Sequence, residues 1–239
     1  MSGKLYVVPT PVGNLDDMTP RAIEVLRRAD LILAEDTRTS AVLMRKFDIT
    51  TPMTSHHKYN EHTTVSAITD RIAAGQIIAL VSDAGTPGIS DPGFLLSREC
   101  RRLGLPVETL PGATALIPAL VNSGLPCDRF VFEGFLPQKK GRATRLAELA
   151  ADTRTFVVYE SPLRVARTLS DLAAACGTER QAAVCREISK LHDTTHRATL
   201  GELAAEFTAT QARGEIVIVV EGRSEESRAP HRNKYKTEE

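Results

Sequence analysis

Several loops of this sequence carry groups that could bind a small polar ligand, and the richest is residues 83–93. This loop holds three glycines, two prolines and two carboxylates within eleven residues. Glycine lets backbone amides approach a ligand without a Cβ in the way, and carboxylates accept hydrogen bonds from hydroxyls and amines. The preceding run Ile77–Val81 has the composition of a strand buried on both faces of a parallel sheet. Because ligands bind beyond the carboxyl ends of such strands, a binding loop is favoured over a plain tight turn.

Two further predicted strands end in polar segments. The first, Pro9–Leu15, is not the G-x-G-x-x-G fingerprint of nicotinamide cofactors, and the chain has no G-x-x-x-x-G-K-[ST] phosphate loop. The second, Glu35–Arg38, places two carboxylates and a guanidinium together. An ordinary helix start, capped by Asp36 or Thr37, explains the same residues, so the two interpretations remain open.

The cysteines and histidines do not predict a metal site. The four cysteines show no C-x-x-C spacing, and no histidine lies in an H-E-x-x-H frame. We therefore expect no bound metal. The histidine groups are His56, His57 and His62, and His192 with His196.

The charges of the chain balance, with 30 basic and 30 acidic residues. A protein that binds nucleic acid through its overall charge usually has a positive excess, so any such contact must be local. The best candidate is a basic patch that a solvated first turn of a helix explains equally well. The sequence has 42% hydrophobic and 25% charged residues and no charged-then-apolar leader, which predicts a globular cytoplasmic protein. The patch consists of Lys139, Lys140, Arg142 and Arg145.

The first half of the chain alternates strands with helices, which predicts a parallel sheet. Glycines and prolines bound these segments where turns are expected. The predicted strands are Leu5–Val8, Leu31–Ala34, Met53–His56, Ile77–Val81 and Val107–Leu110, and the helices are Pro20–Ala29, Thr39–Phe47, Glu61–Ala73, Phe94–Leu103 and Ala113–Val121.

The second half changes character near Ser123–Pro126. Two of its predicted strands follow each other without a helix, which predicts an antiparallel hairpin in a mixed sheet. We expect an α/β domain at 1–117, a second α/β domain at 118–222 and a flexible tail at 223–239. The predicted strands are Phe130–Gly134, Phe156–Tyr159, Ala182–Ile188, Thr194–Leu200 and Glu215–Val220, with a basic helix after the first and the helix Pro162–Cys176 after the second.

Seven motifs occur in an order that resembles the rRNA methyltransferase branch of the tetrapyrrole-methylase superfamily. The resemblance covers about residues 4–222. Several motifs in one order are more specific than any single motif. They are Thr10–Leu15, Glu35–Arg38, Val81–Pro87, Leu110–Gly112, Gly134–Pro137 with Lys139, Tyr159–Pro162 and Arg213–Glu215.

This resemblance implies a class III S-adenosylmethionine-dependent methyltransferase, in which two α/β domains hold the cofactor in the cleft between them. It further implies that the substrate is 16S rRNA within the small ribosomal subunit, methylated on the ribose 2′-hydroxyl of a cytidine in the decoding region. Homodimers are usual in the superfamily. A dimer would also present the basic patch twice.

The resemblance places the cofactor-binding residues at strand ends. The cofactor has a flat adenine, a ribose diol, a sulfonium and an amino-acid end, so it needs carboxylates and backbone groups but no phosphate loop. For Thr114, helix capping is as good an explanation as cofactor contact. The implied residues are Asp83, Ala84, Gly85, Thr86, Ile89, Ser90, Asp91, Ala113 and Thr114, followed by Phe135, Leu136, Tyr159, Ser161, Glu187 and Glu215.

Methyl transfer to a hydroxyl depends mainly on alignment, and a proton acceptor would add roughly 10²- to 10⁴-fold. The candidate acceptors are Asp36, His57 and Lys190. Tyr59 stands where the related pattern has a histidine, which weakens the case for an obligatory base in that segment. The basic patch, joined by Arg38, is the candidate RNA contact.

Two other functions fit the same motifs. One is a methyltransferase acting on a small tetrapyrrole-like ring, and the other is an assembly factor that binds rRNA without catalysis. The basic patch favours RNA over a macrocycle, because a carboxylated ring could use only part of it. Affinity for S-adenosylmethionine would argue against the assembly factor.

Overall fold

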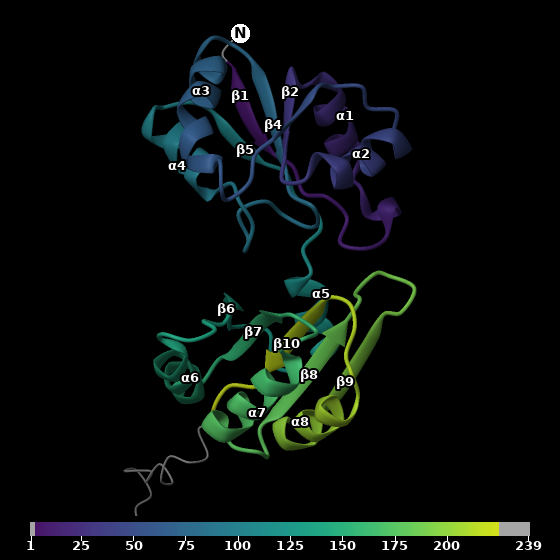
Figure 1. Cartoon of the computed structure of the whole chain (residues 1–239), viewed down its shortest axis with the longest axis vertical. Helices are drawn as coiled ribbons and strands as arrows, with labels where there is room; N and C mark the ends of the chain where they lie inside the picture. Colours follow the sequence, from purple (N-terminus) through teal and green to yellow (C-terminus); the bar gives the residue numbers. More distant parts are fainter. Residues whose placement is uncertain (1–2, 225–239) are drawn as a thin grey trace, which may run out of the picture. The chain divides into compact units, whose positions relative to one another are not determined.

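The computed structural model describes residues 3–224, which form two compact units (Figure 1). The first unit comprises the described residues up to Pro118 together with Glu187–Asp193. The second comprises Ala119–Arg186 together with the described residues from Thr194 onward. The tail predicted at 223–239 lies outside the described residues from position 225. Among the described residues, no helix is long and apolar enough to cross a membrane.

The first unit is built on a five-stranded sheet in which every pairing is parallel, as predicted. Strand β4 lies at its centre between β2 and β1, and its last four residues are buried. The order of the strands is β3-β2-β4-β1-β5. Their bounds are β1 (Lys4–Val7), β2 (Leu31–Ala34), β3 (Met53–Ser55), β4 (Ile77–Val81) and β5 (Val107–Thr109).

Helices cover both faces of this sheet. One hydrophobic cluster joins α1 (Pro20–Arg28) and α2 (Thr37–Lys46) to one face, through side chains such as Leu26 and Leu43. A separate cluster joins α3 (Glu61–Ala73) and α4 (Phe94–Arg102) to the other face. Figure 1 shows the two helix pairs on opposite sides of the sheet. The helices that follow β1 and β2 cover one face of the sheet, whereas the helix that follows β4 covers the other. The carboxyl end of β4 is therefore a switch point, the place where ligands bind in sheets of this kind.

The second unit contains the predicted mixed sheet, in the order β6-β7-β10-β8-β9. Strands β6 and β7 are parallel, whereas β10 is antiparallel to both β7 and β8, and β8 and β9 form an antiparallel hairpin. Helix α5 (Leu116–Ser123) belongs to this unit from Ala119 onward. The other elements are β6 (Phe130–Phe135), α6 (Arg142–Ala151), β7 (Thr155–Glu160), α7 (Val165–Cys176), β8 (Gln181–Arg186), β9 (Thr194–Thr199), α8 (Leu200–Ala209) and β10 (Ile216–Val220).

One face of the second sheet carries a single large core. Side chains of α6, α7 and α8 bury Phe156 and the alternate apolar residues of β8 and β10. On the other face, the Cys185 thiol lies 3.7 Å from the carbonyl oxygen of Ala119 in α5. The sheet is therefore buried on both sides, which explains the continuous Ile/Val run of β10.

Three helix starts and one whole helix differ from the sequence expectations. Helix α2 begins at Thr37 instead of Thr39, because Asp36 is its N-cap. Helix α8 was not predicted, and Thr199, expected inside a strand, is its N-cap in a capping box with Glu202. Helix α5 begins at Leu116 instead of Ala113, because the Ala113 carbonyl accepts a hydrogen bond from the Thr86 hydroxyl at 2.9 Å. Helix α7 begins after a turn at residues 162–164.

Candidate functional site

The carboxyl edge of the first sheet holds three loops that are hydrogen-bonded to one another. Thr10 and Gly85 exchange two backbone hydrogen bonds of 2.8 and 2.9 Å, and the Thr10 hydroxyl donates to the Ser82 carbonyl at 3.1 Å. The Thr86 hydroxyl then joins the loop after β4 to that after β5. The loop after β4 is therefore held from both sides.

Backbone conformation shows why this loop is rich in glycine. Gly85, Gly88 and Gly93 all have positive φ, at +80°, +85° and +129°, and an added side chain is strained there. Ser90 also has a positive φ of 68°. The structure thus brings the cofactor candidates in the loops after β4 and β5 together at the carboxyl edge of the first sheet. Thr114 lies in the second of these loops, two residues before α5, and is not the N-cap of that helix.

Three carboxylates lie where β2 and β4 end, and their environments differ. The Asp83 carboxylate accepts a hydrogen bond from the Asp36 backbone amide at 3.1 Å. The Asp83 side chain is exposed, but partial desolvation beside the loop raises its pKa. Burial, together with the charge of Asp83, also raises the pKa of Glu35. Such perturbed acids in a loop edge are typical of binding and catalytic sites. Glu35 was not among the predicted site residues, since its burial is visible only in the fold.

The pKa of Asp36 is shifted in the opposite direction to those of Glu35 and Asp83. Its carboxylate accepts hydrogen bonds from the Arg38 guanidinium at 2.7 and 3.1 Å and caps α2 by accepting from the Arg38 backbone amide at 2.8 Å. The Arg38 hydrogen bonds lower the pKa of Asp36 to about 2. A carboxylate with so low a pKa is a weak proton acceptor. The capping interpretation of this motif is therefore confirmed.

The histidines after β3 are fixed by local hydrogen bonds. His56 is buried, its Nδ1 lies 3.0 Å from the Thr64 hydroxyl, and burial lowers its pKa. His57 accepts a hydrogen bond at Nδ1 from the Tyr59 amide at 3.3 Å. In a neutral ring that accepts this hydrogen bond, the proton lies on Nε2, which is then a hydrogen-bond donor.

Lys190 lies on the loop Glu187–Asp193, which packs with the first unit. The Ser189 hydroxyl donates to the Asp17 carboxylate at 2.6 Å. A Cβ added to Gly13 would come within 2.6 Å of Lys190 Cγ, so the glycine of the Thr10–Leu15 motif permits this packing. The Lys190 ammonium forms an ion pair of 3.0 Å with the Glu187 carboxylate. Glu187 and Lys190, the two predicted site residues of this loop, are therefore adjacent to each other.

The second unit gathers its cofactor candidates at one edge of its sheet. Phe135 pairs in register with Tyr159, and their rings meet edge to face at 5.9 Å. The residue after Glu215 pairs with Glu160, the neighbour of Ser161. Leu136 differs from the others because its side chain is buried in the core, which leaves only its backbone for a ligand.

The predicted basic patch divides into two kinds of residue. Lys139 and Lys140 are exposed, whereas Arg142 is buried and donates to the Asp171 carboxylate at 2.8 Å, the Thr168 hydroxyl at 3.0 Å and the Pro137 carbonyl at 3.1 Å. Arg142 therefore holds α6 to α7. Arg145 is paired with the carboxylates of Glu133 at 2.5 Å and Glu148 at 2.7 Å.

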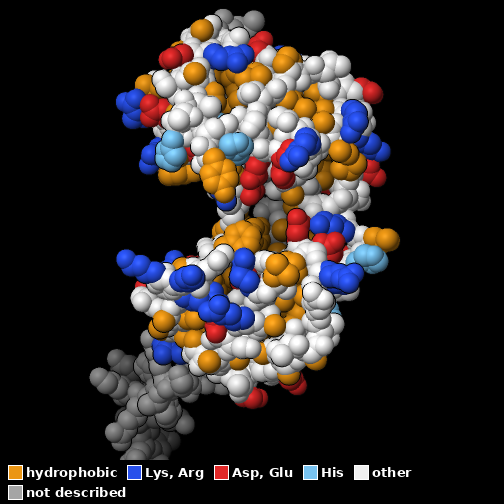
Figure 2. Space-filling view, viewed as in Figure 1, with side chains coloured by type: hydrophobic (Ala, Val, Ile, Leu, Met, Phe, Trp, Pro, Cys, Tyr) orange, Lys and Arg blue, Asp and Glu red, His pale blue; other side chains and the backbone are white. Residues whose placement is uncertain are grey.

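Other cations join the two lysines. A hollow of about 520 Å³ beside Lys139 is also lined by Arg164 and Arg167 of the α7 region. The Arg167 guanidinium is exposed and lies 3.8 Å from its acidic neighbour Asp171. Figure 2 shows Lys and Arg side chains gathered on this face of the second unit.

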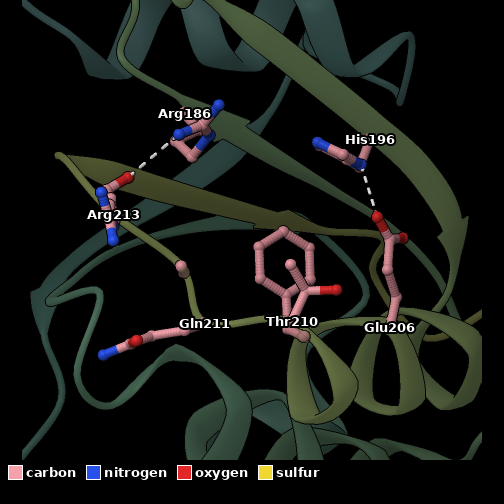
Figure 3. A pocket seen from close by; sticks show the side chains of 8 residues that line it. Arg186, His196, Glu206, Thr210, Gln211 and Arg213 are labelled. Atoms are coloured by element: carbon pink, nitrogen blue, oxygen red, sulfur yellow. Dashed lines mark hydrogen bonds and ion pairs between the residues drawn. The ribbon is translucent and has the colours of Figure 1, made fainter.

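A second hollow of about 210 Å³ in the second unit was not anticipated from the sequence. Figure 3 shows Arg186, Arg213 and Gln211 around it, with the His196 ring directed at the Glu206 carboxylate. The His196 Nδ1 lies 2.7 Å from that carboxylate, and the ring meets Phe207 edge to face at 5.4 Å. No group of three metal-ligating side chains occurs in residues 3–224.

The family of the chain follows from its match to known proteins. The model of the Tetrapyrrole (Corrin/Porphyrin) Methylases matches residues 4–204, and the chain belongs to that family. Solved structures share the fold at lower identity. Diphthine synthase aligns with a TM-score of 0.72 over 92% of this chain and 90% of its own, at 13% identity. Uroporphyrin-III C-methyltransferase from Thermus thermophilus complexed with S-adenyl homocysteine gives 0.63 at 19% identity, over 92% and 97% of the chains.

Sequence relatives are much more similar. The protein named ribosomal RNA small subunit methyltransferase I from Synechocystis sp. is 50% identical over 227 residues, which are 95% of this chain and 81% of that one. The protein of the same name from Thermotoga maritima is 42% identical, over 92% of this chain and 99% of its own length. The relative from Escherichia coli O157:H7 is 47% identical, over 92% and 78% of the chains.

Proposed function

We propose that this chain is an S-adenosylmethionine-dependent methyltransferase of small-subunit ribosomal RNA. Its target is the ribose 2′-hydroxyl of a cytidine in the decoding region of 16S rRNA. The observation that carries the proposal is the 42–50% identity, over more than nine-tenths of this chain, to proteins named for that RNA. Diphthine synthase and uroporphyrin-III C-methyltransferase are 13% and 19% identical, so they support the fold and favour their own substrates less.

The carboxyl edge of the first sheet suits the cofactor. It offers the Asp83 and Glu35 carboxylates for hydroxyl or amine groups and the glycine backbone of residues 85–88 for close approach. When bound there, the cofactor supplies an activated methyl group on its sulfonium. In the second unit, the exposed Phe135 ring, supported edge to face by Tyr159, provides an apolar surface of the kind that receives an adenine.

The protein's own contribution to the reaction is mainly orientation. A well-aligned donor and acceptor gain an effective molarity of about 10⁵ M or more. Among the candidate proton acceptors, Asp36 is held at low pKa, His57 presents a donor and Lys190 is ion-paired. Glu35 and Asp83 have raised pKa values and are better acceptors for the hydroxyl proton.

Lys139 and Lys140 would contact RNA phosphates, with Arg38 as a further exposed cation on the first unit. We further propose that the protein acts in the cytoplasm as a homodimer, so that the lysine pair occurs twice in one assembly. Sedimentation at micromolar protein tests this part. A fully active species at the 26.0 kDa mass of one chain would exclude the dimer.

The decisive assay incubates the protein with labelled S-adenosylmethionine and small subunits from cells that lack the modification. The expected result is label in 16S rRNA with the wild-type chain and at least a tenfold lower rate with Asp83→Ala. Label in a protein, in a tetrapyrrole or nowhere would reject the proposal. Binding of the cofactor without transfer would favour a ligand-regulated assembly factor.

A further inference from the structure

Two aromatic side chains of the first unit are unusually exposed. Tyr59 has 82% and Phe94 62% of its surface accessible, in a chain with only 4 Tyr and 7 Phe residues. Single exposed apolar side chains are common on protein surfaces, so these two rings are informative only through the groups that surround them. Within the first unit, the Tyr59 ring meets one aromatic neighbour, His57, edge to face at 5.9 Å.

Each of these rings has a cation beside it. The Lys58 ammonium lies 4.9 Å from the centre of the Tyr59 ring, and the Arg98 guanidinium lies 5.3 Å from that of Phe94. Both distances are within the range of cation–π attraction. The aromatic surface is therefore positively charged at its margin, which suits an anionic partner and disfavours an aliphatic one.

The two pairs occupy the same end of two neighbouring helices. Tyr59 lies in the turn before α3, and Phe94 is the first residue of α4. The buried Glu61 carboxylate of α3 accepts a hydrogen bond from the Leu95 amide of α4 at 3.3 Å, which ties the two helix starts together. Figure 1 shows α3 and α4 side by side on one face of the first sheet. Both rings thus border the edge that carries the proposed cofactor loop.

Aromatic rings with adjacent cations are the common means of holding unpaired nucleotides. The ring stacks on a base, and the cation contacts the neighbouring phosphate. We infer that Tyr59 and Phe94, with Lys58 and Arg98, form a stacking platform for unpaired nucleotides of the RNA substrate next to the methylated one. This inference rests on the proposed function and assigns these residues a part in it.

The chain contains no tryptophan, so a single introduced tryptophan reports on one position. The variants Tyr59→Trp and Phe94→Trp are titrated separately with an unmodified oligoribonucleotide of the decoding region. Stacking should quench the tryptophan emission. An abasic oligomer of the same length and charge should not quench it. Val42→Trp on α2, which covers the opposite face of the sheet, is the control and should respond to neither.

A second measurement uses the methylation assay. The double variant Tyr59→Leu, Phe94→Leu keeps apolar bulk but loses the rings, and should raise KM for small subunits about 10-fold or more. Its kcat and its affinity for S-adenosylmethionine should stay within about twofold of wild type. Tyr59→Phe should behave like wild type, because it keeps the ring.

Absence of base-dependent quenching, or an unchanged KM in the leucine variant, would overturn the platform. A leucine variant that sediments at half the wild-type mass would also overturn it, because the rings would then belong to an interface between copies. The proposed function fails differently, through a wild-type chain that does not methylate small subunits. The quenching titration remains decisive for the platform in that case, because it needs no turnover.

Discussion

Thr10 and Gly85 form an isolated two-residue bridge through hydrogen bonds of 2.8 and 2.9 Å between their backbones. The bridge joins the loop after β1 to the loop after β4, which are far apart in the sequence. Neither loop can change its path without breaking it. The proposed cofactor loop is therefore held in place by hydrogen bonds between backbone atoms alone. In the sequence, nothing but a threonine and a glycine marks this bridge.

Gly85→Val should lower the affinity for S-adenosylmethionine at least 10-fold. A Cβ at this position would meet no atom closer than 3.6 Å, so the effect arises from the φ of +80° and not from crowding. Forcing a branched residue into that region costs roughly 1–2 kcal/mol and shifts the bridge to Thr10. Calorimetry with the cofactor measures the reduced affinity.

Gly104→Val is the matched control for this variant. Gly104 has a φ of +70°, no atom within 4 Å of an added Cβ, and lies in the turn after α4, away from the loop. It should lose similar stability and keep its affinity for the cofactor. Equal affinities in the two variants would remove the residue 83–93 loop from the binding site.

Asp83→Asn should make the chain more stable at neutral pH while weakening cofactor binding about 10-fold. The folded-state pKa of Asp83 is raised by partial desolvation, so the folded chain holds this proton more tightly than the unfolded chain. The protonated carboxyl therefore stabilises the folded chain below the pKa of the unfolded state, about 4. This stabilisation is lost as the pH rises through the pKa of the folded state.

Denaturant titrations of Asp83→Asn and wild type at pH 3.5 and pH 7 check this. The stability gain should appear at pH 7 and shrink at pH 3.5, where the wild-type carboxyl is protonated. An asparagine oxygen can still accept from the Asp36 amide, so that bond is retained. A variant that is less stable at pH 7 would show that the charge of Asp83 supports the fold.

Arg142→Ala should unfold more easily than wild type, by roughly 2–4 kcal/mol. Its guanidinium is buried, and its removal leaves the Asp171 carboxylate and the Thr168 hydroxyl without their donor. Thermal unfolding measures the effect. A variant of native stability that loses RNA affinity would restore Arg142 to the RNA contacts.

Lys139→Ala with Lys140→Ala should have the opposite profile. Both side chains are exposed, so stability should change by less than about 0.5 kcal/mol. The salt dependence of RNA binding should flatten by up to about 0.7–0.9 slope units for each phosphate that the protein no longer neutralises. The matched control is Lys46→Ala with Arg101→Ala, which removes the same charge from exposed positions of the first unit. An equal effect in the control would show that Lys139 and Lys140 act only through the overall charge of the protein and form no specific RNA contact.

Both sheets and most helices could be predicted because their residue patterns are local in the sequence. The buried run of β4 and the alternation of strand and helix are visible in sequence. Helix α8 also has a local sign, the Thr199–Glu202 capping box, but the strand pattern before it continues through Leu200 and obscures the helix start.

The roles of single charged residues could not be predicted in this way. Arg142 and Lys140 are two positions apart and both basic, yet one is buried and the other exposed. The difference depends on Asp171, which is 29 residues away in the chain and adjacent only in the fold. The raised pKa of Glu35 likewise depends on burial and on Asp83, which lies on a different strand end.

Nucleoside mass spectrometry of 16S rRNA, after incubation of unmodified small subunits with the protein and S-adenosylmethionine, measures the proposed reaction itself. We expect one new 2′-O-methylcytidine in the decoding region, formed at least tenfold more slowly when Asp83→Ala replaces the wild-type chain. A methyl group on a base, on another nucleotide or on no RNA at all would contradict this expectation.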